Sequence, residues 1–290
     1  MGAMWAARKP FRALIVAALA VGAVAGDAQA ATLDRIKSTG EFKIGYRDDA
    51  VPFSFKTAIG EAAGYSVDLC RAVAAHAKQT LGLAELKVTY VPVTAEGRFD
   101  AIRDGRVDLL CGATTATLGR RKMVDFSIPV FVDGASVLYR ADGPGGFEAL
   151  AGKSVGVRAG TTTENALDIT LKRLGIDVQV VAVDDHQDGL AKLEAGTISA
   201  YFADRAILLF LAAGSTKPEM LKLSQRYYTY EPYALAMLRG DDEMRLLVDR
   251  ALSRLYRSGA IEGLFAGSFG PGAKPSEPLK MLYLINALPE

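Results

Sequence analysis

Short apolar runs alternate along this chain with stretches of helical periodicity, and that alternation constrains the fold more than any other feature. Strand-like runs occupy residues 42–46, 86–92, 107–111, 154–158, 178–183 and 199–202. Helix-like stretches cover residues 67–79, 97–104, 162–174, 187–195 and 205–213. Strands that alternate with helices predict parallel sheets covered by helices on both faces, so we expect the α/β class.

The alternation restarts near residue 154, which predicts two successive α/β units. A further strand at 234–237 and helical stretches at 243–258 and 261–269 follow the second unit. We therefore expect one lobe from residues 31–130 and 234–290, an inserted lobe from 135–228, and hinge strands at 130–134 and 229–233. A small ligand is expected in the cleft between two lobes joined by such a hinge.

Residues 1–30 have the form of a cleavable secretory signal. Basic residues at 8, 9 and 12 precede an apolar run at 13–25 and an Ala-x-Ala motif at 28–30. The run is shorter than the roughly 18 apolar residues that span a bilayer, so we expect cleavage after Ala30 and not a membrane anchor. No cysteine stands directly after the run, which predicts a soluble exported protein without a lipid anchor.

The charge balance excludes a nucleic-acid partner. Residues 31–290 carry 31 basic and 32 acidic side chains, once three basic and one acidic residue of the signal are subtracted. A nucleic-acid-binding surface would require a basic excess or stripe. Cys70 and Cys111 are the only cysteines, and in an exported protein the residues allow either a disulfide or two buried thiols.

Two loops after strands suggest an anion site. Residues 111–116 read Cys-Gly-Ala-Thr-Thr-Ala and lead to Arg120, and residues 158–164 read Arg-Ala-Gly-Thr-Thr-Thr-Glu and open a helix. Ligands of open α/β sheets bind at such strand ends, where helix N-termini offer free N–H groups. Arg120 can donate two parallel hydrogen bonds to a carboxylate and Thr115 a third. The alternative is a solvated basic turn at Arg120 and a helix cap at Thr115.

No metal, cofactor or catalytic centre is expected. The two histidines, His76 and His186, lack neighbours at metal-binding spacing, and the chain contains neither a nucleophile elbow nor a P-loop.

The segment at 115–129, Thr-Ala-Thr-Leu-Gly-Arg-Arg-Lys-Met-Val-Asp-Phe-Ser-Ile-Pro, resembles the signature of the family 3 extracellular solute-binding proteins. These are the polar amino-acid receptors of bacterial ABC importers. Similar segments stand in the family's order at 45–55, 64–69, 158–164 and 233–237. The resemblance implies the type II periplasmic binding protein fold, a monomer in the periplasm, and inner-membrane ABC permease subunits as partners.

Within this family the chain looks most like the glutamate/aspartate-binding branch. The marks are Arg47 before Val-Pro-Phe-Ser, Cys-Gly-x-Thr-Thr at 111–115, and Asp-His at 185–186. The branch implies a clamp for the ligand α-carboxylate and a carboxylate for its ammonium. These roles would fall to Thr115, Arg120 and the N–H of Thr161 for the carboxylate, and to Asp204 for the ammonium.

The branch also implies that Arg47, Arg98 and His186 receive the side-chain carboxylate of L-glutamate or L-aspartate. A neutral ligand would leave these buried cations unpaired, at a cost of several kcal/mol per ion. Taken singly, Arg47 also fits an exposed turn, Arg98 a helix surface and His186 a solvated loop. Asp204 also fits a helix cap.

Three departures from the branch put this preference in question. Ala95 and Ala113 stand where serines are common, and Gly119 replaces an acidic residue. Glutamine and asparagine are therefore alternative ligands. An alternative of another class is an exported enzyme similar to cyclohexadienyl or arogenate dehydratase, with Glu164 or His186 as general acid. Asp204 argues against it, because a keto acid has no ammonium.

Overall fold

The computed structural model describes residues 1–2 and 32–290, so the predicted signal lies almost wholly outside the described residues. None of the helices in these two ranges combines the length and the hydropathy that crossing a bilayer requires.

The first lobe is built on a five-stranded sheet with the order β5-β1-β6-β15-β7. These strands are β5 (Lys87–Pro92), β1 (Glu41–Tyr46), β6 (Leu109–Cys111), β15 (Ala236–Leu238) and β7 (Val124–Phe126). β1 runs parallel to β5 and β6, and β15 runs antiparallel to β6 and β7. The late strand β15 therefore completes the first sheet.

Both faces of this sheet are buried, because neighbouring residues of one strand enter different cores. Leu109 packs in the core with α2 (Tyr65–Thr80) and α7 (Asp242–Ser258), whereas Leu110 packs in the core with α3 (Arg98–Arg103). Two further helices, α1 (Thr32–Thr39) and α8 (Ala260–Phe269), contact α7. The Cys70 and Cys111 side chains form a disulfide that joins α2 to β6, which decides between the two states that the sequence left open.

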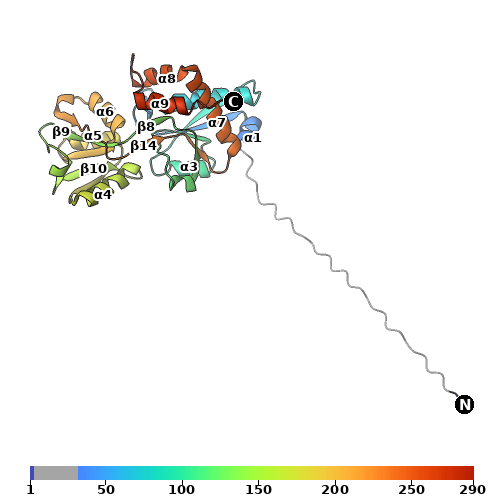
Figure 1. Cartoon of the computed structure of the whole chain (residues 1–290), viewed down its shortest axis with the longest axis horizontal. Helices are drawn as coiled ribbons and strands as arrows, with labels where there is room; N and C mark the ends of the chain where they lie inside the picture. The colour runs from blue at the N-terminus through green and yellow to red at the C-terminus, as the bar shows by residue number, and fades with distance from the viewer. Residues whose placement is uncertain (3–31) are drawn as a thin grey trace. The chain divides into compact units, whose positions relative to one another are not determined.

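The second lobe repeats the architecture with the order β11-β10-β12-β9-β13. Its strands are β11 (Gln179–Val183), β10 (Ser154–Arg158), β12 (Ala200–Asp204), β9 (Ala135–Arg140) and β13 (Leu221–Leu223). β10 is parallel to β11 and β12, and β9 is antiparallel to β12 and β13. Helix α4 (Thr162–Leu174) covers one face, and α5 (His186–Glu194) and α6 (Arg205–Gly214) cover the other (Figure 1). The predicted α/β class is confirmed.

Two strands connect the lobes. β8 (Phe131–Asp133) and β14 (Glu231–Tyr233) form an antiparallel two-stranded ladder. The exact lobe limits that the sequence suggested remain a prediction.

Several elements were absent from the sequence prediction. A small sheet of β2 (Asp49–Ala50), β3 (Ser54–Lys56) and β4 (Ala62–Ala63) follows β1, and α9 (Glu277–Ile285) packs on β8 and α7. Three short 3-10 helices, η1 (Arg120–Lys122), η2 (Phe147–Leu150) and η3 (Pro218–Met220), complete the described elements.

Candidate functional site

The loop after β6 is fastened to the second hinge strand. Thr115 forms an isolated antiparallel bridge with Tyr233. The Ala116 N–H donates to the Pro232 carbonyl at 2.8 Å, and the Ala234 N–H donates to the Thr114 carbonyl at 3.0 Å. The predicted clamp loop is thus held against β14 by backbone hydrogen bonds.

Arg120 opens η1 and turns back onto this loop. Its Nη1 donates to the Thr115 carbonyl at 2.9 Å, and its guanidinium lies 5.4 Å from the centre of the Phe99 ring. Burial lowers the pKa of Arg120, whereas the charges of Glu231 and Asp204 act in the opposite direction. Arg120 is therefore half-buried in the site and is not a solvated turn residue.

The second lobe meets this loop with the N-terminus of α4. Thr161 is the N-cap, and its Oγ1 accepts from the Glu164 N–H at 3.2 Å and donates to the Arg158 carbonyl at 2.7 Å. Thr162 Oγ1 lies 3.3 Å from Thr115 Oγ1 and donates to Glu231 Oε2 at 2.9 Å. These contacts bring both lobes together at one end of the site.

Three carboxylates gather beside that end, at the hinge. Asp204 ends β12 and makes no side-chain cap for α6. Its Oδ2 accepts from the Tyr233 hydroxyl at 2.6 Å, and its Oδ1 is buried without a partner among the described residues. Burial, followed by the charges of Asp133 and Glu231, raises the pKa of Asp204 well above its ordinary value. An unpartnered buried oxygen of this kind suits a ligand ammonium.

Asp133 belongs to the same group. Its Oδ2 lies 3.5 Å from the Tyr233 hydroxyl and accepts from the Ala206 N–H at 3.0 Å. Burial raises the pKa of Asp133 to about 6, with a further contribution from Glu231. Both carboxylates therefore compete for the one Tyr233 hydroxyl proton, and the repulsion between their like charges favours a protonated form.

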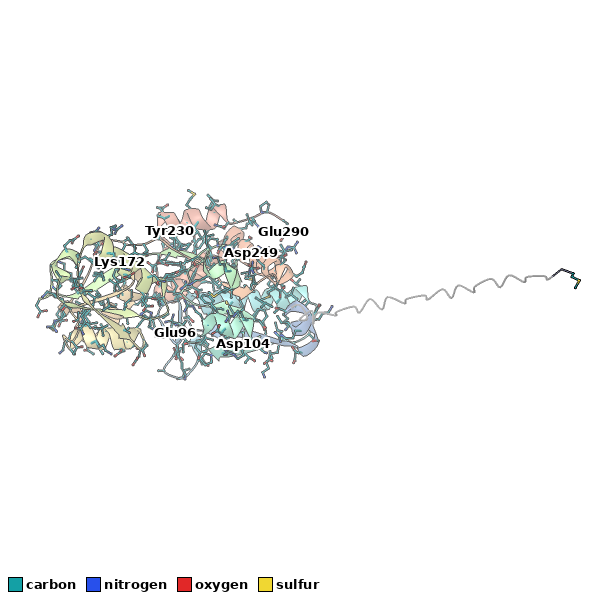
Figure 2. All side chains as sticks on the ribbon, turned by 90° about the horizontal axis from the view of Figure 1, so that it is seen from below. Glu96, Asp104, Lys172, Tyr230, Asp249 and Glu290 are labelled. Atoms are coloured by element: carbon teal, nitrogen blue, oxygen red, sulfur yellow. A yellow bond between two sulfur atoms is a disulfide. The ribbon has the colours of Figure 1, made fainter. Side chains whose placement is uncertain are left out.

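The opposite end of the site is rich in arginine. Arg47 is buried after β1, and its Nε donates to Asp49 Oδ1 at 2.7 Å. Asp49 Oδ2 accepts from Arg158 Nε at 3.2 Å, and Arg158 Nη1 donates to Glu96 Oε1 at 3.2 Å. Glu96 is labelled in Figure 2. The sequence-based argument that a neutral ligand would leave Arg47 unpaired is wrong, because Asp49 neutralises it within the protein.

Arg98 is different. It is 2% exposed at the start of α3, and both of its Nη atoms reach only the Gly160 carbonyl, at 3.4 Å. Its Nε has no partner among residues 1–2 and 32–290. Burial lowers the pKa of Arg98 well below its ordinary value, and the charges of Arg120 and Arg47 lower it further. Arg98 is therefore a buried cation without a counter-ion.

His186 is the first residue of α5, with Asp185 as the N-cap, and not a solvated loop residue. Its Nδ1 lies 2.7 Å from the Tyr201 hydroxyl, and the side chain is buried. Burial lowers the pKa of His186 to about 3 despite the nearby charge of Asp49. The imidazole is therefore neutral at physiological pH.

A cleft of about 690 Å³ lies beside Arg120 and the N-terminus of α4. The first lobe lines it with Ala95, Glu96, Phe99, Thr117, Gly119, Arg120 and Met123, and the second with Gly160, Thr161, Thr162, Glu164 and Asn165. Of the predicted site residues, Arg120 and Thr161 line this cleft. The other five, Arg47, Arg98, Thr115, His186 and Asp204, are not among its lining residues.

Sequence reasoning missed Asp49, Glu96 and Glu231 and treated Arg158 only as the start of a loop. A signal was present for two of them, because Arg158 ends the parallel strand β10 and Asp49 follows the end of the parallel strand β1, where ligand sites form. In the described part of the chain, no group of His, Cys, Asp and Glu side chains could hold a metal ion.

Residues 42–271 match the family described as bacterial extracellular solute-binding proteins, family 3. The chain belongs to this family. It is 34% identical over 253 residues to an L-glutamate/L-aspartate-binding protein of Pseudomonas aeruginosa, covering 87% of this chain and 84% of the relative. It is 30% identical over 263 residues to a glutamate/aspartate import solute-binding protein of Escherichia coli, covering 89% and 87%.

Solved structures of amino-acid-binding proteins share the fold. An ancestral arginine-binding protein bound to glutamine matches with a TM-score of 0.69 and 27% identity, over 80% of this chain and 98% of that one. The ancestral amino-acid-binding protein AncCDT-1, a precursor of cyclohexadienyl dehydratase, matches with a TM-score of 0.71 and 28% identity, over 83% and 100%. The fold is therefore the predicted bilobal type II periplasmic binding protein fold.

Proposed function

We propose that this protein is the periplasmic substrate-binding component of an amino-acid ABC importer and that it binds L-glutamate or L-aspartate between its lobes. The names of the two relatives in Pseudomonas aeruginosa and Escherichia coli support this ligand class. The proposed partners are the permease subunits of the importer, and the proposed state is a monomer.

The observation that carries the proposal is the division of charge in the site. The hinge end offers Arg120 for an α-carboxylate and the unpartnered Oδ1 of Asp204 for an ammonium. The other end holds three guanidinium groups, Arg47, Arg98 and Arg158, against the carboxylates of Asp49 and Glu96. Three positive and two negative charges leave one positive charge, which one ligand side-chain carboxylate would neutralise.

Closure of the lobes follows from the same arrangement. A ligand that contacts Arg120 on one lobe and Asp204 on the other gains both sets of contacts only in the closed state. Binding therefore shifts the population toward that state by its differential affinity.

Calorimetry with Arg120→Ala tests the site. We expect this variant to lose binding of every amino acid, because the α-carboxylate is common to all of them and its bidentate partner is removed. Arg121→Ala is the matched control, since the neighbouring exposed residue carries the same charge. Near wild-type affinity in Arg120→Ala would refute the assignment.

A thermal-shift screen of the twenty amino acids tests the ligand class. A shift with glutamate and aspartate alone would support the proposal, and a shift with glutamine and asparagine as well would widen it. Shifts with other amino acids only would refute it.

The likeness to AncCDT-1 keeps a dehydratase-like enzyme as the second candidate. Glu164 lines the cleft, but its Oε2 accepts from the Gly160 N–H at 3.0 Å. His186 is buried and neutral, which makes it a poor proton donor. Turnover of prephenate or arogenate by the purified protein would favour the enzyme.

A further inference from the structure

We propose that Asp49 is a specificity-determining residue of the proposed ligand site: its carboxylate engages Arg47 and Arg158, so that Arg98 alone meets the ligand's side-chain carboxylate. The inference rests on the proposed function and names a residue that sets its substrate preference.

Both oxygens of Asp49 are already engaged. Oδ1 accepts from Arg47 of the same lobe at 2.7 Å, and Oδ2 accepts from Arg158 of the other lobe at 3.2 Å. The carboxylate is buried and sits in β2, where Asp49 pairs with Phe55 of β3. The pairing fixes the carboxylate between the two guanidinium groups, in the position that a ligand carboxylate would otherwise take.

The electrostatics agree with an ionised Asp49. Burial acts to raise the pKa of this carboxyl, but the charges of Arg47 and Arg158 and the hydrogen bond from Arg47 hold the pKa below its ordinary value. Asp49 therefore carries its charge throughout the physiological range and cancels one of the three guanidinium charges. Glu96 neutralises a second guanidinium charge by its ion pair with Arg158.

Arg98 is the one of these three arginines whose guanidinium forms no ion pair with Asp49 or Glu96. No carboxylate lies within ion-pair distance of its guanidinium in the described part of the chain. The guanidinium carbon lies 4.6 Å from the centre of the Phe99 ring, which carries no charge. A ligand carboxylate beside Arg98 would satisfy the free Nε and relieve its repulsion by Arg120, Arg47 and Arg158. Arg47 would contribute less than the resemblance to the glutamate/aspartate branch implies.

Asp49→Asn tests the inference because it removes the charge and keeps the shape. The measured quantity is the ratio of the L-glutamine to the L-glutamate dissociation constant, determined by calorimetry. A ratio is insensitive to a general loss of closure, which weakens both ligands alike. We expect it to rise about tenfold or more, the effect of one added positive charge a few ångströms from the ligand carboxylate in a partly buried site.

Asp48→Asn is the matched control, because this neighbour is exposed and the substitution changes the net charge equally. It should leave the ratio within about twofold, as expected for a screened surface charge. Arg98→Gln should lower the same ratio to near unity, and Arg47→Gln should lower it less. If Asp49→Asn does not fold, Asp49→Ser provides the same comparison.

The outcomes separate this inference from the proposed function. A wild type that binds glutamate while Asp49→Asn leaves the ratio unchanged would overturn the inference and leave the proposed function intact. A wild type that binds glutamine but not glutamate would overturn the proposed function. In that case Asp49→Asn must still gain affinity for glutamate, and without that gain the inference falls as well.

Discussion

Lowering the pH from 7 to 5 should weaken amino-acid binding about tenfold, because the hinge carboxylates then hold a proton that the ligand ammonium must displace. The groups involved are Asp133 and Asp204, which share the Tyr233 hydroxyl. Glu231 faces them from β14, and Arg120 and Arg205 are the cations on the neighbouring elements.

The magnitude follows from the pKa of about 6 at Asp133. The ammonium binds the site with Asp133 ionised, so the apparent dissociation constant scales with 1 + 10^(6 − pH) for this group. This factor is about 1.1 at pH 7 and about 11 at pH 5, a tenfold ratio or about 1.4 kcal/mol. The sign is fixed: a carboxyl whose pKa is raised in the empty site favours binding at high pH.

Calorimetry at pH 5, 6, 7 and 8 in buffers of different ionisation enthalpy measures both the affinity and the protons released. We expect nearly one proton released at pH 5 and almost none at pH 8. His186, with a pKa of about 3, stays neutral throughout and adds nothing. The side chain of glutamate is largely ionised at pH 5 and contributes little.

Asp133→Asn should flatten the profile, because it removes the like charge beside Asp204. Asp249→Asn is the control: this carboxyl also has a pKa raised by burial, but it accepts from the Ile128 N–H at 2.8 Å, away from the cleft. An affinity that stays constant between pH 5 and pH 7 in the wild type would refute the role assigned to the Asp133 proton.

Two further predictions concern the scaffold. Replacing Cys70 and Cys111 together by alanine should lower the free energy of unfolding by about 4 kcal/mol, because the disulfide closes a loop with a sequence separation of 41 residues. Urea denaturation of the variant and of the wild type under oxidising conditions measures this difference. Equal denaturation midpoints would contradict the prediction. Gly134→Ala should destabilise the protein by about 2 kcal/mol or more through overpacking, because an added Cβ would lie 2.2 Å from the Thr229 carbonyl oxygen. Gly267→Ala is the control, since nothing lies within 4 Å of its added Cβ. Similar melting temperatures for the two variants would contradict the prediction and show that the backbone at the hinge can shift.

The alternation of apolar runs was sufficient to predict the α/β class and the two lobes, because buried parallel strands have a recognisable composition. It could not reveal β2, which has two residues and no periodicity. The pairing of Asp49 with Arg158 spans 109 positions and exists only once the lobes meet. The buried state of His186 also depends on a distant residue, Tyr201.

Family resemblance supplied the predicted site residues, and the structure adds what surrounds them. Asp204 occupies the N-cap position of α6, as the residue type alone suggested, yet its side chain bonds Tyr233 and leaves the cap unmade. Arg47 was predicted to meet the ligand carboxylate, which stays a prediction, and the structure adds that Asp49 forms an ion pair with it. Such neighbours are set by tertiary packing, which local sequence does not encode.

The backbone bridge between Thr115 and Tyr233 has a mechanical consequence. Hydrogen bonds on both sides of this pair make the loop and the hinge strand a single rigid piece. A change in the twist of β14 then moves the loop with it, without any side chain changing rotamer. In the proposed ligand site, Thr115 would therefore follow any change in the angle between the lobes that twists β14.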